Sequence, residues 1–339
     1  MNIGELIELK MKFSGNVELE NFRNYLKRHL EPSCHGLMEV GDLIQKAGSS
    51  WVFEAKGLDD EDLAVKFFFN VPTRVYSGKN GGVVSDDVLR NSSACGDEIV
   101  IGDCEREARI NEAIVERNIG CVVEYVDWNF VEDVPFMIFK KVGEGDTLID
   151  LMELDLNEEF GIKEKLGTIW NIVYPLSELH SLGIAHLDVK PGNYMFNSRD
   201  GLFYLGDFGI AKHVGDSGIY MGEIVHFTPE YFTPEHVSER RVLSKKTDIY
   251  AAGLIAYEIL FGTRARGEYD GGKESFVDYA KREGFKELRP NIDWCRSWHD
   301  LHYTTLGYDI IREMLKVSPE ERSESVEVLE NLEELLNLI

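Results

Sequence analysis

The pattern of apolar residues changes once along this 339-residue chain, close to Gly145. Before that point, short runs of alternating or continuous apolar residues predict strands. After it, apolar residues recur every three or four positions, which predicts helices. A strand-rich first part followed by a helix-rich second part is typical of an α+β protein with two lobes. The predicted strands are 39–46, 51–56, 63–69, 121–128 and 135–142, and the predicted helices are 103–117, 158–182, 247–261, 304–316 and 321–338.

Two segments lie outside this division. The first is an N-terminal extension, residues 1–37, with a predicted amphipathic helix over 16–31, whose apolar residues at helical spacing are Leu19, Phe22, Leu26 and Leu30. The second is residues 70–102, which are rich in Gly, Ser and Asn and lack periodicity, so that a surface insertion is expected. Either segment is a candidate binding site for a regulatory partner.

The composition excludes several classes of protein. With 43% hydrophobic and 29% charged residues, wholesale disorder is excluded. The 36 Lys and Arg against 61 Asp and Glu give a net charge of −25. Nucleic-acid binding is not expected, because such affinity comes mainly from basic residues on phosphates. A charge of this sign favours basic partners or substrates. The longest apolar run, 251–261, is too short to span a bilayer, so no membrane association is expected.

The cysteines and the N-terminus indicate the compartment. The five cysteines are scattered and never spaced as C-x-x-C, which argues against a disulfide framework and against a structural zinc site. The first residues, MNIGELIELKMKF, lack the basic flank and apolar core of a secretory signal. We therefore expect a cytoplasmic protein.

Several short motifs carry groups capable of chemistry. Lys66 ends an apolar strand, and the loop His186-Leu187-Asp188-Val189-Lys190-Pro191-Gly192-Asn193 places an acid, a base and an amide close together. Asp207-Phe208-Gly209 follows the short apolar strand 202–205. The sequence Thr-Pro-Glu-Tyr-Phe-Thr-Pro-Glu then spans 228–235, and Asp248 opens an apolar helix.

In this order and on these elements, the motifs resemble the eukaryotic-type protein kinase family over residues 38–338. The resemblance implies a two-lobed α+β fold. Its N-lobe, 38–142, would hold a small antiparallel sheet with one main helix and the 70–102 insertion, and its C-lobe, 146–338, would be mostly helical. It also implies ATP and Mg²⁺ (or Mn²⁺) as cofactors and protein substrates.

The resemblance assigns roles that suit phosphoryl transfer, in which the protein supplies positioning and positive charge. Lys66 would hold the ATP phosphates. Asp188 would orient and deprotonate the substrate hydroxyl, with Lys190 neutralising the γ-phosphate. Asn193 and Asp207 would bind the metal through hard oxygen ligands.

Lys66 needs a carboxylate partner, and Glu107 is the expected one. Glu107 shares a helix face with Ile110 and Ile114 and should point inward. Glu105 and Glu112 are the alternatives if the helix has another register.

Further nucleotide contacts follow from the resemblance. The phosphate-covering loop keeps none of the three family glycines, but its small residues still allow ATP to bind; it contributes Gln45, Ala47, Gly48 and Ser50. Val52 and Ala64 would pack above the adenine and Met195 below it. Lys141 lies in the predicted hinge, 140–142, and Asp146 matches the position that contacts the ribose.

The activation segment, residues 207–235, departs from members that phosphorylation switches on. Those members have an Arg before the catalytic Asp, whereas this chain has Leu187. We therefore expect activity without a phosphate on this segment. Glu235 and Arg322 match a structural ion pair of the family.

The resemblance implies an active Ser/Thr protein kinase, because Lys190 within D-x-K-P-x-N and Thr228 are typical of Ser/Thr-specific members. One alternative is a pseudokinase, a nucleotide-binding scaffold without catalysis; the altered glycine loop is the feature that favours this alternative. The other is a small-molecule kinase of the aminoglycoside or choline type. That class lacks the Thr-Pro-Glu segment, the helix start at Asp248 and the Arg322 partner.

Overall fold

The computed structural model describes residues 37–46, 50–68, 76–77, 82–83, 96–131, 134–153, 160–215, 218–220, 228–238, 242–267, 276–283, 288, 292 and 295–339. The predicted helix at 16–31 lies outside these residues, as does most of the predicted insertion. The described residues form two compact units. The N-terminal unit includes residues 37–68, 96–117 and 123–142, and the C-terminal unit includes 118–122 and 143–339.

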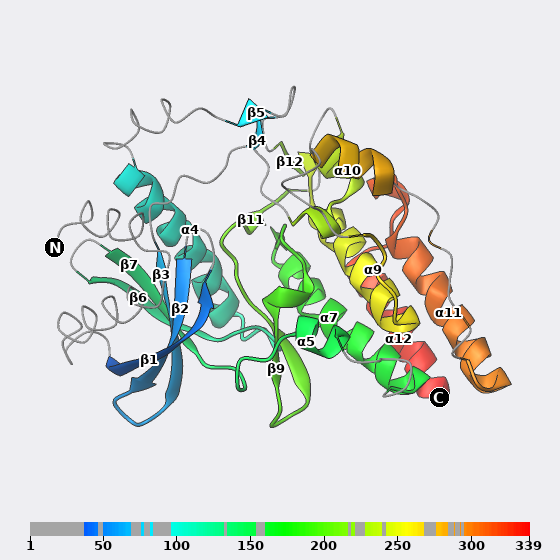
Figure 1. Cartoon of the computed structure of the whole chain (residues 1–339), viewed down its shortest axis with the longest axis horizontal. Helices are drawn as coiled ribbons and strands as arrows, with labels where there is room; N and C mark the ends of the chain where they lie inside the picture. The colour runs from blue at the N-terminus through cyan, green and yellow to red at the C-terminus, as the bar shows by residue number, and fades with distance from the viewer. Residues whose placement is uncertain are drawn as a thin grey trace. The chain divides into compact units, whose positions relative to one another are not determined.

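The N-terminal unit contains a five-stranded antiparallel sheet of order β1-β2-β3-β7-β6 and one long helix, α4 (Figure 1). The strands are β1 (Leu37–Lys46), β2 (Ser50–Gly57), β3 (Asp62–Phe68), β6 (Tyr125–Val131) and β7 (Val134–Lys140), and the helix is α4 (Gly96–Glu116). The short strand β4 (Tyr76–Ser77), which pairs with β5 (Gly82–Val83), belongs to the C-terminal unit.

The strand register separates the two faces of this sheet. Val52 lies opposite Lys66, and Ala64 lies opposite Phe139, so these side chains share one face. Helix α4 packs on that face, where its Cys104 and Ala108 join a buried cluster with residues of β3, β6 and β7. The opposite face is apolar and fully buried at Phe53, Val65, Phe67, Phe136 and Ile138.

Two predicted boundaries in this unit are wrong. Helix α4 begins at Gly96 rather than 103 and runs through Gly102, because a glycine costs a helix interior only about 1 kcal/mol and packing can override it. Strand β6 begins at Tyr125 rather than 121. Cys121 has a φ of 55°, and its carbonyl accepts a hydrogen bond from Leu205 N, so the backbone there pairs outside the sheet.

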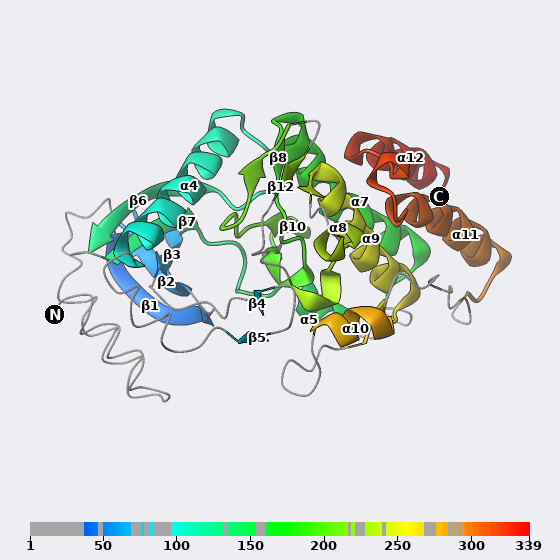
Figure 2. The same cartoon turned by 90° about the horizontal axis from the view of Figure 1, so that it is seen from above.

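The C-terminal unit is mostly helical, and in Figures 1 and 2 α7, α9, α11 and α12 pack side by side. Helix α9 is buried along its whole length from Thr247 to Phe261, as expected of a helix that is apolar all round. The helices are α5 (Leu148–Met152), α7 (Ile162–Ser181), α8 (Pro234–Val237), α9 (Lys245–Phe261), α10 (Phe276–Glu283), α11 (Trp298–Met314) and α12 (Ser325–Leu338).

Short strands and 3₁₀ turns hold the loops of this unit. The pairs are β9 with β10, β8 with β11, and β12 with β13. The strands are β8 (Ile184–Ala185), β9 (Tyr194–Asn197), β10 (Leu202–Leu205), β11 (Lys212–His213), β12 (Ile219–Tyr220) and β13 (Val242–Leu243), and the 3₁₀ turns are Pro191–Asn193, Pro229–Tyr231 and Pro319–Glu321.

Capping side chains and turns explain where the helix ends differ from the predictions. Helix α11 starts six residues before the predicted 304, because Ser297 Oγ accepts a hydrogen bond from Asp300 N at 3.1 Å. Helix α12 starts at Ser325 rather than 321, because Pro319–Glu321 forms a separate 3₁₀ turn. Among the described helices, none has both the length and the apolar composition needed to cross a membrane.

Candidate active site

A buried ion pair joins the sheet to α4 in the N-terminal unit. Lys66 Nζ lies 2.8 Å from Glu107 Oε1 and 3.1 Å from Oε2. Lys66 is 8% exposed and Glu107 1%. The predicted contact is confirmed, and the alternatives are excluded as partners of Lys66: Glu105 lies 3.9 Å from Arg109 on the surface, and Glu112 is exposed.

The next turn of α4 supports Glu107. Asn111, where the family usually has an apolar residue, is fully buried and donates from Nδ2 to the Glu107 carbonyl at 2.9 Å. Its Oδ1 has no hydrogen-bond partner in the part of the chain that the structure describes. A buried polar group of this kind costs stability unless it is satisfied.

Among the other predicted nucleotide contacts, Gln45, Ser50, Val52 and Ala64 lie on the same sheet face as Lys66. Gln45 pairs with Val52 across β1 and β2, and Ser50 is buried at the start of β2. Ala47 and Gly48 lie outside the described residues. Lys141 Nζ is bound to Glu54 Oε1 at 2.8 Å, so its side chain is held against β2.

In the C-terminal unit, one buried carboxylate fixes the loop that contains Asp188. Asp248, from α9, accepts hydrogen bonds from His186 N at 2.8 Å and Leu187 N at 2.7 Å. Its Oδ2 also lies 2.9 Å from His180 Nε2. In the sequence, Asp248 was recognised only as the start of a helix, so its role as anchor of this loop was missed. The signal that could have indicated this role is an aspartate in the first turn of a helix that is apolar all round.

His186 packs and bonds inside the loop rather than facing outward. Its Nδ1 accepts a hydrogen bond from Asp188 N at 3.3 Å, which leaves the ring proton on Nε2, 3.1 Å from the Gly206 carbonyl. The ring also lies 5.1 Å from that of Phe208. This geometry agrees with a structural role.

Two predicted site residues, Lys190 and Asn193, meet at the Asp188 carboxylate, together with Thr228. Lys190 Nζ lies 2.6 Å from Oδ2, and Asn193 Nδ2 lies 3.4 Å from the same oxygen. Thr228 Oγ1 donates to Oδ1 at 3.0 Å. A carboxylate with two donors on one oxygen and a hydroxyl on the other is held in one orientation.

Asn193 and Asp207 present oxygen ligands. Asn193 Nδ2 donates to the Asp188 carbonyl at 2.8 Å, so the amide oxygen is the atom left for a cation. Asp207 is exposed and has a φ of 64°, a conformation that Asp tolerates better than most residues. A carboxylate and an amide oxygen are hard ligands that fit Mg²⁺.

Asp146 and Met195 come together on neighbouring backbone. The Asp146 carbonyl accepts a hydrogen bond from Phe196 N at 2.8 Å, and Thr147 bridges Met195. Asp146 is exposed and Met195 half-buried, so both side chains are accessible.

Arg266 is a residue that sequence reasoning missed. It is buried, its guanidinium lies 3.8 Å from the Phe232 ring centroid, and its Nη1 donates to the Phe232 carbonyl at 2.5 Å. Nearby, Tyr231 OH donates to Glu258 Oε2 at 3.1 Å, and burial raises the pKa of Glu258. These contacts fix the turn that follows Thr228.

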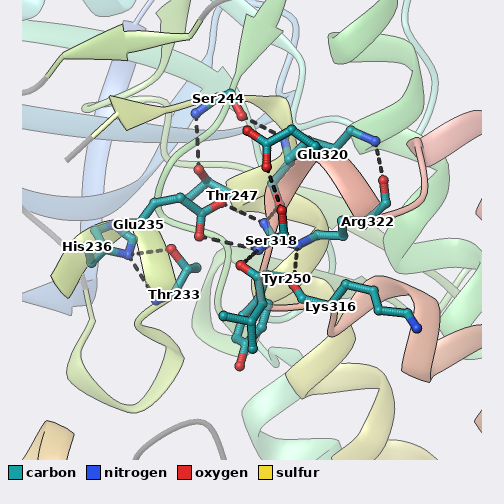
Figure 3. A network of polar contacts seen from close by, with 12 residues as sticks. Thr233, Glu235, His236, Ser244, Thr247, Tyr250, Lys316, Ser318, Glu320 and Arg322 are labelled. Carbon is teal, nitrogen blue, oxygen red and sulfur yellow. Dashed lines mark hydrogen bonds and ion pairs between the residues drawn. The ribbon is translucent and has the colours of Figure 1, made fainter. Parts of the chain in front are cut away.

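The predicted pair of Glu235 and Arg322 is confirmed as a buried network (Figure 3). Arg322 Nη1 lies 2.6 Å from Glu235 Oε1, and its side chain is fully buried. Its Nε donates to the Lys316 carbonyl at 3.0 Å and its Nη2 to the Val317 carbonyl at 3.3 Å. The guanidinium also lies 4.9 Å from the Tyr250 ring centroid.

Arg322→Met should lower the free energy of unfolding by about 3–5 kcal/mol, because it leaves the buried Glu235 charge uncompensated. Urea denaturation measures this. The double variant with Glu235→Gln should recover part of the loss. Arg312→Met is the matched control, since Arg312 forms an exposed pair with Asp309 at 3.0 Å and should cost less than about 1 kcal/mol. Equal losses for the two single variants would contradict the prediction.

His236, beside Glu235, makes stability depend on pH. It is buried and accepts a hydrogen bond from Thr233 N at Nδ1, and burial lowers its pKa to about 4. Between pH 4 and its ordinary value of 6.5, the unfolded chain therefore binds a proton that the folded chain does not. Stability is lost as the pH falls through this window.

We expect the wild type to lose about 3 kcal/mol more than His236→Asn between pH 6.5 and 4, since asparagine keeps an acceptor but has no proton to gain. Denaturation curves across the window measure the difference. His302→Asn, at an exposed position of α11, should follow the wild type. A His236→Asn curve parallel to the wild type would refute the assignment.

Comparison with known proteins identifies the class. Residues 91–332 match the family described as the protein kinase domain, so the chain belongs to this family and has its two-lobed α+β fold. It is 32% identical over 151 residues to the serine/threonine-protein kinase nekl-2 of Caenorhabditis elegans, covering 42% of this chain and 41% of that protein. It is 29% identical over 248 residues to the serine/threonine-protein kinase DCLK1 of Rattus norvegicus. This match covers 72% of this chain and 52% of that protein. A further relative is calcium-dependent protein kinase 27 of Arabidopsis thaliana, which is 27% identical over 241 residues. This match covers 69% of this chain and 45% of that protein. The chain thus spans about half, or less, of the length of these relatives.

Proposed function

We propose that this protein is an active kinase that transfers the γ-phosphoryl group of ATP to Ser and Thr hydroxyls of protein substrates. The observation that carries the proposal is the Asp188 carboxylate, with Lys190 at 2.6 Å, Asn193 at 3.4 Å and Thr228 at 3.0 Å. The names of the relatives support Ser/Thr specificity.

Asp188 receives the proton of the attacking hydroxyl. Its carboxylate is already oriented by three donors, so it is fixed before the substrate arrives. Lys190, with 28% of its side chain exposed, can leave Oδ2 for the transferred phosphoryl group, which frees that oxygen to accept the hydroxyl proton. Lys66 holds the α- and β-phosphates, and Glu107 keeps its ammonium in place.

Asp207 and Asn193 would hold Mg²⁺, which neutralises charge on the phosphates when bound. The fit rests on their donor set, a carboxylate and an amide oxygen. Asn193 donates Nδ2 to the Asp188 carbonyl at 2.8 Å, which leaves its amide oxygen as the ligand atom.

The proposal is tested with γ-labelled ATP, Mg²⁺ and a generic protein substrate, followed by identification of the labelled amino acid. Wild type should label Ser and Thr, and Asp188→Asn should lose about 10²–10⁴-fold in rate. Asp309→Asn, the same change on the surface of α11, should behave as wild type. ATP binding without transfer would show a pseudokinase. Transfer only to an amino sugar or choline would show a small-molecule kinase.

Basic peptides are proposed as the preferred substrates. The motive is the net charge of −25, which attracts cationic chains and raises their local concentration. By the family resemblance, Glu230, Glu268 and Asp270 map near the expected peptide groove. Glu230 lies in the turn after Thr228, and Glu268 and Asp270 lie outside the described residues. A peptide array should show higher rates for Lys and Arg flanks, and lower rates at raised salt. A preference for acidic flanks would overturn this part.

The compartment and partners belong to the same proposal. Cys104, Cys121 and Cys295 are free thiols, which favours a reducing compartment such as the cytoplasm. Residues 16–31 and 70–102 are the segments where a regulatory partner would bind. Deleting 1–32 and comparing the rates of the two proteins tests the first of these.

A further inference from the structure

The residue directly before Asp188 has an unusual backbone and a buried side chain. Leu187 has a φ of 68°, the left-handed region that most residues avoid. Asp248 Oδ1 binds its N–H at 2.7 Å. The direction of Asp188 therefore depends on how firmly Leu187 is held in this conformation.

The Leu187 side chain is held by an apolar cluster. We call this set the Leu187 cluster; its buried members are Ala185, Leu187, Val214 and Leu243, with Ile210 and Ile219 packed against them. Ile210, Val214 and Ile219 belong to the activation segment, 207–235. Half of the cluster therefore comes from the activation segment. In kinases that phosphorylation activates, a phosphate on this segment holds it in place.

Backbone pairing brings these activation-segment residues to Leu187. Strand β11 pairs with β8, and Val214 N donates to the Gly183 carbonyl at 2.7 Å. Strand β12 pairs with β13, placing Ile219 opposite Leu243. Two short ladders and the apolar contacts thus hold both sides of the cluster.

We propose that Leu187 is a positioning residue that couples the activation segment to Asp188 through apolar packing, in place of a phosphate and an arginine. The proposal rests on the proposed kinase function. Packing of Val214 and Ile219 in the Leu187 cluster keeps the Leu187 backbone left-handed. The Asp188 carboxylate therefore keeps its orientation. It explains how the described residues 207–215 and 218–220 of the segment are held when the residue before Asp188 carries no charge.

Leu187 variants separate the packing from the backbone requirement. Leu187→Met keeps an apolar side chain without a branch at Cβ and should retain kcat within about threefold. Leu187→Ile has the same volume but is β-branched, which the left-handed conformation disfavours, so kcat should fall about 10- to 100-fold. The KM for ATP should stay unchanged in both, because the role is to aim Asp188. Thermal unfolding confirms that each variant is folded.

A glycine pair tests the contribution of the activation segment. Gly218 has a φ of 74°, and a Cβ there would lie 2.7 Å from the Leu243 carbonyl oxygen and 2.8 Å from Val242 Cγ1. Gly201 has a φ of 75°, with nothing within 4 Å of a Cβ. Both alanine variants carry the same backbone strain, but only Gly218→Ala disturbs the pairing of β12 and β13. We expect lower kcat and faster hydrogen exchange at Val214 N–H for Gly218→Ala alone.

The outcomes distinguish the two proposals. No transfer by the wild type would overturn the kinase function. With an active, phosphatase-treated wild type, equal kcat values for Leu187→Ile and Leu187→Met would overturn the role of Leu187, as would equal values for Gly218→Ala and Gly201→Ala. A wild type that loses its activity on phosphatase treatment would also overturn it, since a phosphate would then order the segment.

Discussion

At ordinary Mg²⁺ concentrations, Asp207→Asn and Asp207→Ala are expected to abolish transfer while leaving the protein folded. Each removes the carboxylate assigned to the metal, and a bound metal supplies several kcal/mol of charge stabilisation during phosphoryl transfer. The exposed position of Asp207 predicts little loss of stability. Asparagine tolerates the φ of 64°, whereas alanine there should cost about 1 kcal/mol, so the two variants separate metal loss from backbone strain.

Initial rates over a series of Mg²⁺ and Mn²⁺ concentrations measure this effect, with thermal unfolding as the folding control. Asp309→Asn, an exposed aspartate on α11, should keep the wild-type rate and metal dependence. Asp207→Asn should show residual transfer only at raised metal concentrations. A near-wild-type rate at ordinary Mg²⁺ would show that the metal ligand is another residue.

Lys66→Met should lower kcat/KM by several orders of magnitude, with a smaller but still large loss for Glu107→Gln. The first variant removes the cation assigned to the phosphates, and the second releases it from its 2.8 Å partner. Lys66→Met also leaves the 1% exposed Glu107 without a charge partner, at a cost of about 3–5 kcal/mol in unfolding free energy.

The Lys66→Met/Glu107→Gln double variant removes both charges, so it should be more stable than Lys66→Met and equally inactive. Steady-state kinetics and urea denaturation of the same samples give both quantities. Glu105→Gln is the matched control, because Glu105 lies two residues before Glu107 and therefore on the exposed side of α4. If Glu105→Gln impairs the enzyme more than Glu107→Gln, then the assigned pair does not hold the phosphates.

Short motifs allowed much of the site to be predicted from the sequence. The pairing of Lys66 with Glu107 followed from a helix-face argument, and that of Glu235 with Arg322 from the family resemblance; in both cases burial makes an unpaired charge so unfavourable that one partner is strongly specified. Strands β2 and β3 lie within one residue of their predicted ends, since β2 alternates in burial and β3 is a short apolar run that ends fully buried.

Features that depend on distant contacts could not be predicted. Cys121 looked like the start of a strand, but its carbonyl bonds to Leu205 N, 84 positions away in another part of the chain, and no local pattern announces this. Arg266 carries no local signal either, because its burial depends on Phe232, 34 positions earlier in the chain. The short strands β12 and β13 have two residues each, too few for periodicity to mark.

The anchoring of His186 and Leu187 by Asp248 also has a consequence for biosynthesis. The N–H groups of the loop and their acceptor are 62 and 61 residues apart. At about 5–20 residues per second, the ribosome makes the loop roughly 3–12 s before Asp248 is translated. During that interval the nascent loop lacks its native acceptor, and its N–H groups bind water instead. Nascent chains stalled before Asp248 should therefore expose the 186–193 loop to proteases, and chains stalled after α9 has left the exit tunnel should protect it.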